Sequence, residues 1–378
     1  MAPSERPRVV ISGSGLWTPA HVITNEELVA SYNAWADRYN QIHAAAIADG
    51  QMEAKPEGSA AFIEKAAGIK QRFVYAKEGT LDIDRMRPSI PERPEEALSD
   101  QAEIAIDAGR QAMAAAGKTG ADIDAVIVSC AYTQRAYPAI AIEVQEALGI
   151  DGFGFDMLVA CSAATFGLHR AYEMVAAGTA RCVLAINPEL ITPQVNYCDR
   201  DSHFIFGDVA TAAIVERADT CTGTHSFDVL GVQAQTRFSS NVRSNFGHLS
   251  RANDVDPFGP DKLFHQNGRR VFKEVCPLAI QHMLTHIDRH GLTVADIRRW
   301  WLHQANIHMN QMICTKLIGR EATFDEAPIV LDRYANTASA GSMIAFHLHH
   351  EDLAAGDHGV ICSFGAGYSV GSLVVRKR

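Results

Sequence analysis

The sequence has fewer basic than acidic residues, and this imbalance argues against one class of partner. It holds 34 Lys and Arg residues and 44 Asp and Glu residues in 378 positions, which gives a formal net charge of −10 at pH 7. Nucleic-acid-binding proteins need a basic footprint to neutralise phosphates. We therefore expect no nucleic-acid partner, and we expect anionic ligands to bind only at local basic clusters.

Long hydrophobic segments are also missing. The chain contains no run of about 18 apolar residues, the length that is needed to cross a bilayer. The first residues, MAPSERPRVV, lead into a strand-like segment without the apolar core of a secretory signal. We therefore expect no membrane partner and a cytoplasmic location.

Three common site motifs are absent as well. The eight cysteines include no CxxC pair, so neither a zinc site nor a disulfide framework is predicted. GSG at 13–15 follows a strand, but Thr18 replaces the third glycine of a dinucleotide fingerprint. His282, His286 and His290 share one helical face without an accompanying carboxylate motif. The sequence thus predicts neither a metal nor a cofactor.

What the chain does contain is alternation of apolar strands with helical patterns. Hydrophobic residues make up 47% of the sequence, enough for a large core. Runs typical of buried strands occur at 9–13, 125–130, 182–187, 211–216, 300–303, 359–364 and 372–376. Helical patterns lie between them, so we predict an α/β fold whose sheets are covered on both faces.

The two halves of the chain resemble each other. Ala-Asp-Ile precedes a strand at 121–123 and again at 295–297, and Ala-Ala-Gly ends a helix at 176–178 and at 354–356. The two offsets are nearly equal and close to half the chain length. This periodicity favours duplication of one βαβ-rich unit.

The duplication places an N-terminal half at residues 1–217 and a C-terminal half at residues 218–378. Two stretches do not fit the alternation of strands and helices that makes up a minimal α/β unit. Residues 29–60 are Ala-rich and helical in character, and residues 76–98 are charged and interrupted by prolines. We expect both to be ordered insertions that form a cap, an interface element or a surface excursion.

One cysteine stands at a position suited to chemistry. Cys161 ends an apolar segment and is followed by the small residues Ser, Ala, Ala and Thr at a helix start. A thiol at a helix N-terminus experiences the helix dipole, which lowers its pKa and favours the thiolate. The alternative is a buried structural cysteine.

Polar residues in the second half suggest partners for this thiol. His303 follows a buried strand, and Asn336 precedes a second small-residue helix, at the position that the repeat pairs roughly with Cys161. The glycine-rich segment 363–372 can bring backbone N–H groups close to a reacting carbonyl. A nucleophile with two such polar groups suits acyl transfer through a thioester.

The motifs, taken in order, resemble those of a known family. They are ACSAA around Cys161, FGDVATAAIV at 206–215, HQAN at 303–306, ANTASAG at 335–341 and FGAGYSVGS at 364–372. With them the chain resembles the β-ketoacyl-acyl-carrier-protein synthase III branch of the thiolase-like condensing enzymes. The resemblance implies a five-layered α/β/α/β/α fold, a homodimer and chemistry without a cofactor.

The resemblance also implies a mechanism. Cys161 attacks an acyl-CoA thioester, and the backbone N–H groups of Cys161 and Ala366 form the oxyanion hole. His303 and Asn336 hold the carbonyl of malonyl-acyl carrier protein while CO2 leaves. The resulting carbanion attacks the acyl group and gives a 3-oxoacyl-acyl carrier protein, a reaction of fatty acid biosynthesis.

Binding residues carried over from the family are only partly present. Phe62 stands where the family has a Trp against CoA, Ala66 replaces an Arg, and Arg200 matches the Arg that stacks on adenine. We therefore expect CoA binding to be altered. Lys273 matches a carrier-protein contact, and Arg269 and Arg270 lie beside it. His308 replaces a further docking Arg, and its effect on carrier-protein docking stays open.

The acyl pocket is expected to involve Phe206 and, from the neighbouring subunit, Tyr137. A Tyr at that gate alone favours a short primer. The insertions and the altered CoA contacts instead suggest a remodelled site, and each buried methylene contributes about 0.8 kcal/mol. We therefore favour a medium-chain primer of about six to ten carbons.

Two other functions remain open at this point. The first is a same-fold acyltransferase, or an enzyme that joins two acyl chains without malonyl decarboxylation. The second is a catalytically silent subunit of an assembly. The presence of Cys161, His303 and Asn336 together argues against a silent subunit, because such a subunit needs none of them.

Overall fold

The apolar runs of the sequence form one nine-stranded mixed sheet in a computed structural model that describes residues 7–245, 254, 256 and 259–378. The strand order is β11-β12-β13-β8-β1-β7-β6-β4-β5. The strands are β1 (Val9–Trp17), β4 (Ala125–Cys130), β5 (Phe153–Leu158), β6 (Cys182–Glu189), β7 (Val209–Arg217), β8 (Phe227–Ser239), β11 (Ile297–Leu302), β12 (His358–Gly365) and β13 (Gly367–Lys377). Every predicted strand is present.

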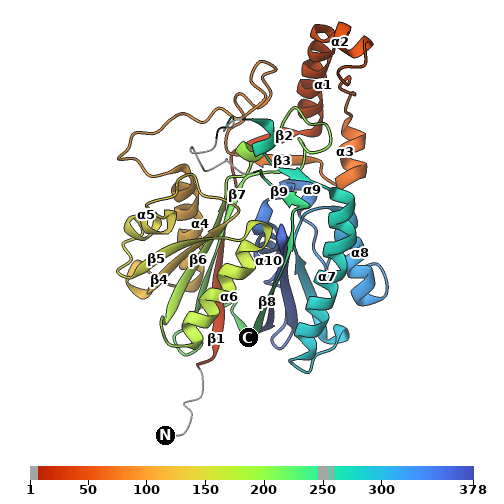
Figure 1. Cartoon of the computed structure of the whole chain (residues 1–378). Helices are drawn as coiled ribbons and strands as arrows, with labels where there is room; N and C mark the ends of the chain where they lie inside the picture. The colour runs from red at the N-terminus through yellow and green to blue at the C-terminus, as the bar shows by residue number, and fades with distance from the viewer. Residues whose placement is uncertain (1–6, 246–253, 255, 257–258) are drawn as a thin grey trace.

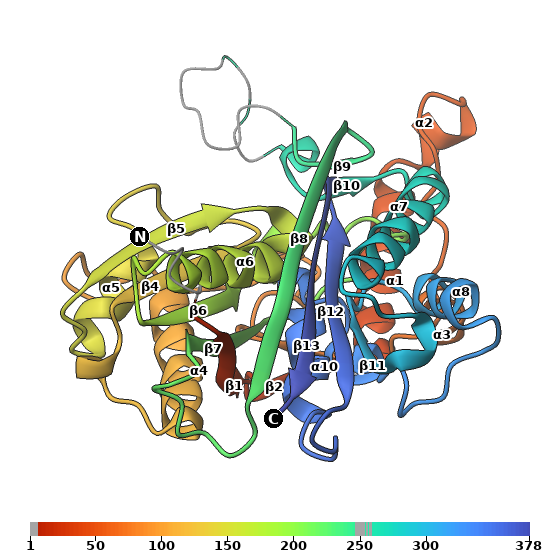
Figure 2. The same ribbon diagram turned by 90° about the horizontal axis from the view of Figure 1, so that it is seen from below.

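Helices cover this sheet in layers. They are α4 (Asp100–Ala116), α5 (Ile140–Ala147), α6 (Ala163–Ala176), α7 (Gly268–Asp288), α8 (Ile307–Ile318) and α10 (Gly341–Leu348). α4 and α5 pack outside the N-terminal strands, and α7 and α8 lie outside the C-terminal strands (Figures 1 and 2). α6 and α10 contact strands of both halves. The predicted α/β/α/β/α thiolase-like arrangement is therefore confirmed.

The two halves of the sheet meet at a narrow junction. β1 and β8 pair only at Val10 with Asp228 and at Ile11 with Phe227. The predicted boundary after residue 217 falls between β7 and β8. The division of the chain into two units at that point stays a prediction.

The GSG segment serves helix packing in this fold. A Cβ atom on Gly13 would lie 2.4 Å from the carbonyl oxygen of Ala112, and one on Gly15 would lie 2.1 Å from that of Ala108. Both carbonyls belong to α4. The glycines therefore allow β1 and α4 to approach closely, which explains a motif that carries no dinucleotide fingerprint.

Sequence patterning missed two strands of the sheet, β5 and β8, and β8 is the longest strand of the sheet. Its C-terminal part, QAQTRF at 233–238, is polar, and Phe238 at its end is 94% exposed. A strand with so much solvent exposure lacks the continuous apolar run by which the other central strands were found. Pairing with β13 holds it instead.

The first insertion forms a helical projection. α1 (Asn25–Ile42) and α2 (Ala44–Ala48) extend away from the sheet, and the chain returns to α3 (Ala60–Ala67) (Figure 1). The small sheet of β2 (His21–Thr24) and β3 (Gln71–Val74) forms the base. No helix described in the structure combines the length and hydrophobicity of a membrane span.

The second insertion, residues 76–98, contains no helix or strand and packs beside the first. Ser31 donates a hydrogen bond to the carbonyl oxygen of Leu81 at 2.9 Å, and Arg38 forms an ion pair with Asp84. Short connections complete the fold: β9 (Val242–Arg243), β10 (His265–Gln266) and α9 (Leu331–Tyr334). The two insertions thus support each other on one side of the molecule.

Candidate active site

A cavity of about 700 Å³ collects most of the predicted site residues. Cys161, His303 and Asn336 all line it, although they come from different halves of the chain. Its other predicted members are Phe62, Phe206, Arg269 and Ala366. A volume in this range is typical of small-molecule sites, which hold roughly 300–1,000 Å³.

The local backbone presents Cys161 to the cavity. Cys161 lies on a 3₁₀ turn, Ala160–Ser162, whose first residue has a φ of 45°, uncommon for a residue other than glycine. Gly365 packs directly against the cysteine, because a Cβ there would lie 2.4 Å from the Cβ of Cys161. This contact explains why position 365 of the glycine-rich segment is occupied by a residue without a side chain.

The thiol is more strongly protonated than the sequence suggested. Burial raises the pKa of Cys161 to about 12, and the charge of Glu189 acts in the same direction. The backbone N–H groups of Ala366 and Cys161 lower this pKa but do not offset the burial. Because α6 begins only at Ala163, the thiol precedes the helix, and the predicted lowered pKa is wrong.

The duplication pairs Cys161 with a different residue from the one expected. Ala338 has a φ of 48° and begins the 3₁₀ turn before α10, as Ala160 does before α6. Ser339 is therefore the structural counterpart of Cys161, and Asn336 lies three positions earlier. Ser339 donates hydrogen bonds from its backbone N–H and its hydroxyl to Glu189.

Asn336 is fixed by backbone pairing with the segment around Phe206. Its N–H donates to the carbonyl oxygen of Ile205 at 2.9 Å, and its own carbonyl accepts from Gly207 N–H at 3.1 Å. The side-chain Oδ1 accepts from Ala338 N–H at 3.0 Å. This bond orients the side chain and leaves the amide NH2 group as the donor for a ligand.

His303 is neutral in this environment. Its backbone N–H donates to the carbonyl oxygen of Cys362 at 2.8 Å, and its ring stands edge-on to Phe364 with centroids 5.2 Å apart. Burial lowers the pKa of His303 to about 4. Its Nδ1 atom has no hydrogen-bond partner among the described residues. A neutral imidazole can donate one hydrogen bond without carrying a charge.

Phe62 lines the cavity and is in contact with Arg200. The guanidinium carbon of Arg200 lies 4.1 Å from the ring centroid of Phe62, so two predicted CoA-binding residues are in contact. Ala66 contributes backbone instead of a basic side chain, since its carbonyl oxygen accepts from Asn306 Nδ2 at 2.8 Å. His308 is similarly engaged, with Nε2 2.8 Å from the carbonyl oxygen of Lys65.

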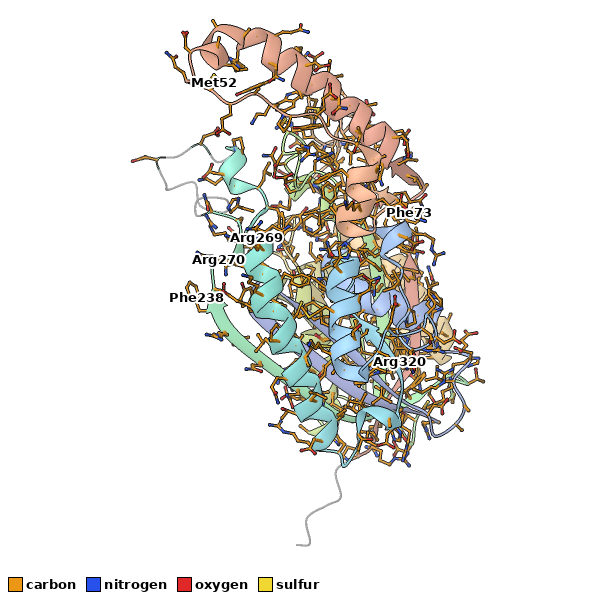
Figure 3. The ribbon with its side chains drawn as sticks, turned by 90° about the vertical axis from the view of Figure 1, so that its right-hand side faces the viewer. Met52, Phe73, Phe238, Arg269, Arg270 and Arg320 are labelled. Atoms are coloured by element: carbon orange, nitrogen blue, oxygen red, sulfur yellow. The ribbon has the colours of Figure 1, made fainter. Side chains whose placement is uncertain are left out.

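The predicted docking residues lie on the exposed side of α7. Arg269 lines the main cavity, and Lys273 lines an adjoining hollow that it shares with His308. Arg269 and Arg270 lie at the N-terminal end of α7, on the side over which the first insertion projects, with Met52 near its tip (Figure 3). Arg269 and Lys273 thus line the cavity or the hollow beside it, and Arg270 is the neighbour of Arg269 on α7.

One predicted pocket residue lies away from the cavity. Tyr137 is 84% exposed and does not line it within this single chain. Phe206 does line it and packs edge-on against Phe264, with centroids 4.7 Å apart. Val242 of β9 and Phe264, which directly precedes β10, also line the cavity, and neither offered a sequence signal. Glu189 could have been noticed as a carboxylate at the end of a buried strand.

Two of the histidines that share one face of α7 contact a buried serine. His282 Nε2 and His286 Nδ1 lie 3.0 Å and 2.7 Å from the hydroxyl of Ser372. Burial lowers the pKa values of both histidines. Within the described part of the chain, no group of three or more His, Cys, Asp or Glu residues is arranged to hold a metal ion.

Comparisons with known proteins point to one family. The family model described as 3-oxoacyl-[acyl-carrier-protein] synthase III matches residues 155–236, and the model for its C-terminal part matches residues 287–377. The β-ketodecanoyl-[acyl-carrier-protein] synthase of Pseudomonas aeruginosa is 54% identical over 347 residues, 92% of this chain and 99% of that protein.

More distant relatives extend the match. The β-ketoacyl-[acyl-carrier-protein] synthase III of Symbiobacterium thermophilum is 30% identical and covers 97% of this chain and 98% of its own length. The crystal structure of 3-oxoacyl-(acyl carrier protein) synthase III from Pseudomonas aeruginosa has a TM-score of 0.75 at 21% identity, with 98% of each chain covered. The latter likeness concerns the fold.

Proposed function

The chain belongs to the 3-oxoacyl-[acyl-carrier-protein] synthase III family, and from this premise we propose that it extends an acyl-CoA primer with malonyl-acyl carrier protein. The product is a 3-oxoacyl-acyl carrier protein of fatty acid biosynthesis. The observation that carries this proposal is the single cavity lined by Cys161, His303 and Asn336 together.

In the first half-reaction, the sulfur of Cys161 attacks the thioester carbonyl and CoA leaves as its thiol. The N–H groups of Cys161 and Ala366 stabilise the tetrahedral oxyanion, and removing one such donor costs roughly 3–4 kcal/mol. Because burial raises the pKa of the Cys161 thiol, we expect its proton to leave during the attack rather than beforehand.

In the second half-reaction, malonyl-acyl carrier protein loses CO2 and becomes an enolate. Asn336 Nδ2–H and the neutral His303 ring donate to the enolate oxygen, so charge develops where donors already stand. The enolate carbon then attacks the acyl carbonyl, and the C–S bond to Cys161 breaks. The Cys161 thiolate that leaves takes up a proton from solvent, which regenerates the thiol. The acyl chain is longer by two carbons.

The primer in this proposal is a medium-chain acyl-CoA, with eight carbons as the leading candidate. The 54% identical relative is named for a β-ketodecanoyl product, and a condensation that adds two carbons reaches this product from an eight-carbon primer. The aromatic pair Phe206 and Phe264 provides an apolar wall for such a chain.

Partner binding is assigned to the two sides of the cavity mouth. Phe62 and Arg200 are proposed to bind the nucleotide part of CoA. Lys273, Arg269 and Arg270 are proposed to dock an acidic carrier protein on α7, because their side chains are exposed beside the opening.

The proposal also includes a homodimer in the cytoplasm. β5 is an edge strand of the sheet, and its Phe153 and Leu158 are 44% and 52% exposed. Tyr137 and Ile142 add exposed apolar surface nearby in the sequence. Pairing two β5 edges would cover these residues and bring Tyr137 of each subunit towards its neighbour.

The test separates the two half-reactions. His303→Ala and Asn336→Ala should each lower the release of CO2 from malonyl-acyl carrier protein by about 100-fold or more, while acylation of Cys161 by octanoyl-CoA changes less than about 10-fold. Labelled CO2 and mass spectrometry of the acyl-enzyme measure the two steps. Cys161→Ala serves as the control that cannot be acylated.

Equal losses in both steps for both variants would contradict the assigned roles. Formation of a product from two acyl chains, without CO2 release from malonyl-acyl carrier protein, would instead identify the enzyme as an acyl–acyl condensing relative.

A further inference from the structure

The first insertion packs directly on the loop that carries Arg200. Tyr32 of α1 is buried and stacks on His203, with ring centroids 4.9 Å apart and planes 14° from parallel. His203 Nδ1 in turn lies 3.0 Å from the carbonyl oxygen of Asp199 and 3.1 Å from that of Arg200. The ring stack therefore couples α1 to the backbone of this loop.

Two asparagines of α1 hold the extended segment that returns from the projection. Asn33 accepts from Gly58 N–H at 2.8 Å and donates to the Gly58 carbonyl at 3.2 Å. Asn40 makes the same pair of bonds to Lys55, at 2.8 and 2.9 Å. Because seven residues are close to two helical turns, both side chains lie on one face of α1. Each asparagine side chain thus forms hydrogen bonds with both the N–H and the carbonyl group of one residue of the returning segment.

The returning segment, residues 55–58, also positions Arg200. Glu57 lies between the two clamped residues, and its carbonyl oxygen accepts a hydrogen bond from Arg200 Nε at 2.8 Å. The guanidinium rests on Phe62, which lines the cavity. A free Arg side chain has several rotatable bonds and loses much freedom when it binds a ligand. Here that freedom is restricted before any ligand arrives.

We propose that the first insertion holds Arg200 against Phe62 and thereby preforms a binding site for the nucleotide end of acyl-CoA. Asn33 and Asn40 are positioning residues in this arrangement, acting through Glu57. A planar guanidinium stacks on the purine ring of a nucleotide and attracts the phosphates of that nucleotide. Because the side chain is ordered in advance, less entropy is lost on binding. The inference rests on the proposed acyl-CoA primer.

The experiment compares two substrates that carry the same thioester. Octanoyl-CoA has the nucleotide and octanoyl-pantetheine lacks it. In the Asn33→Ala/Asn40→Ala double variant, KM for octanoyl-CoA should rise about 2- to 10-fold with kcat unchanged, while kcat/KM for octanoyl-pantetheine stays constant. Gln41→Ala, an exposed position on the same helix, is the matched control and should change neither.

A direct binding measurement keeps the inference separate from the primer assignment. Adenosine 3′,5′-bisphosphate, titrated calorimetrically, should bind the double variant about 2- to 10-fold more weakly than the wild type. If the wild type binds the bisphosphate but is never acylated by octanoyl-CoA, the proposed primer is wrong, and the proposed role of the first insertion is unaffected.

Equal losses with both thioesters would show that the asparagines merely hold the fold together, and this result overturns the inference. Unchanged values for both thioesters and for the bisphosphate overturn it as well. Should the double variant lose its cooperative thermal transition, the single Asn40→Ala variant takes its place, with the same selective loss expected at a smaller size.

Discussion

A buried carboxylate, Glu189, connects the stability of the protein to pH. It is fully buried and accepts hydrogen bonds from Ala131 N–H and from Ser339. Burial raises the pKa of Glu189 to about 7, against its usual 4.5. A raised pKa means that the protonated form suits the fold, so its contribution is complete below pH 4.5 and is lost as pH rises through 7.

The Glu189→Gln substitution should therefore remove this pH dependence of the stability. As pH rises from 4.5 to above 7, the wild type should lose stability relative to the variant by up to roughly 3 kcal/mol. Urea unfolding of both proteins between pH 5 and 8 measures the difference. Any hydrogen bond weakened by the amide is a constant offset and cancels. Parallel curves across this range would refute the assignment.

At the same scale, the sequence indicates the proposed reacting residues better than it indicates their environment. Cys161, His303 and Asn336 follow from motifs that are local in the chain. The protonation of the Cys161 thiol does not, because it depends on burial and on a carboxylate 28 positions away. The bond between Glu189 and Ser339 joins residues 150 apart in the chain, which no local pattern encodes.

Among the secondary-structure elements, β1 and α4 pack so closely that the size of the residues between them is restricted. Gly15→Ala should destabilise the protein by about 1–3 kcal/mol or more, because the new Cβ meets the backbone oxygen of Ala108 at 2.1 Å. Gly109→Ala on α4 is the matched control. There the nearest atoms are 3.4 Å away, on Leu148 and Leu184, so we expect a change within about 1 kcal/mol.

Urea unfolding measures both variants under one set of conditions. Equal stabilities would contradict the packing explanation of the glycine pair.

The elements divide by how local their signals are. Helices such as α4 carry an N-cap, Ser99, and a C-terminal glycine, Gly117, and the structure places both caps there. β8 escaped detection because its stability comes from pairing with β13, far along the sequence. The insertions were found as departures from the α/β pattern. The amide pairs of Asn33 and Asn40 become visible only once the chain has folded back.

At the scale of the whole molecule, the sheet has an exposed edge at β5. β5 offers unpaired backbone groups along one side, since its only ladder partner among the described strands is β4. Exposed edges with large apolar side chains invite pairing with another chain. A second copy supplies an identical edge, and antiparallel pairing of the two would continue the sheet across a two-fold axis.

Leu158→Glu tests this arrangement by placing a charge on the edge. The wild type should sediment at twice the 41.1 kDa chain mass, and the variant at the chain mass, because the two subunits would bring like charges together within an apolar contact. Phe324→Glu is the matched control, since Phe324 is 53% exposed against 52% for Leu158 but lies outside β5, between α8 and α9. It should remain dimeric. A wild type that sediments as a monomer, or a Leu158→Glu variant that stays dimeric at micromolar concentration, would remove the edge of β5 from the interface and Tyr137 from the acyl channel of its neighbour.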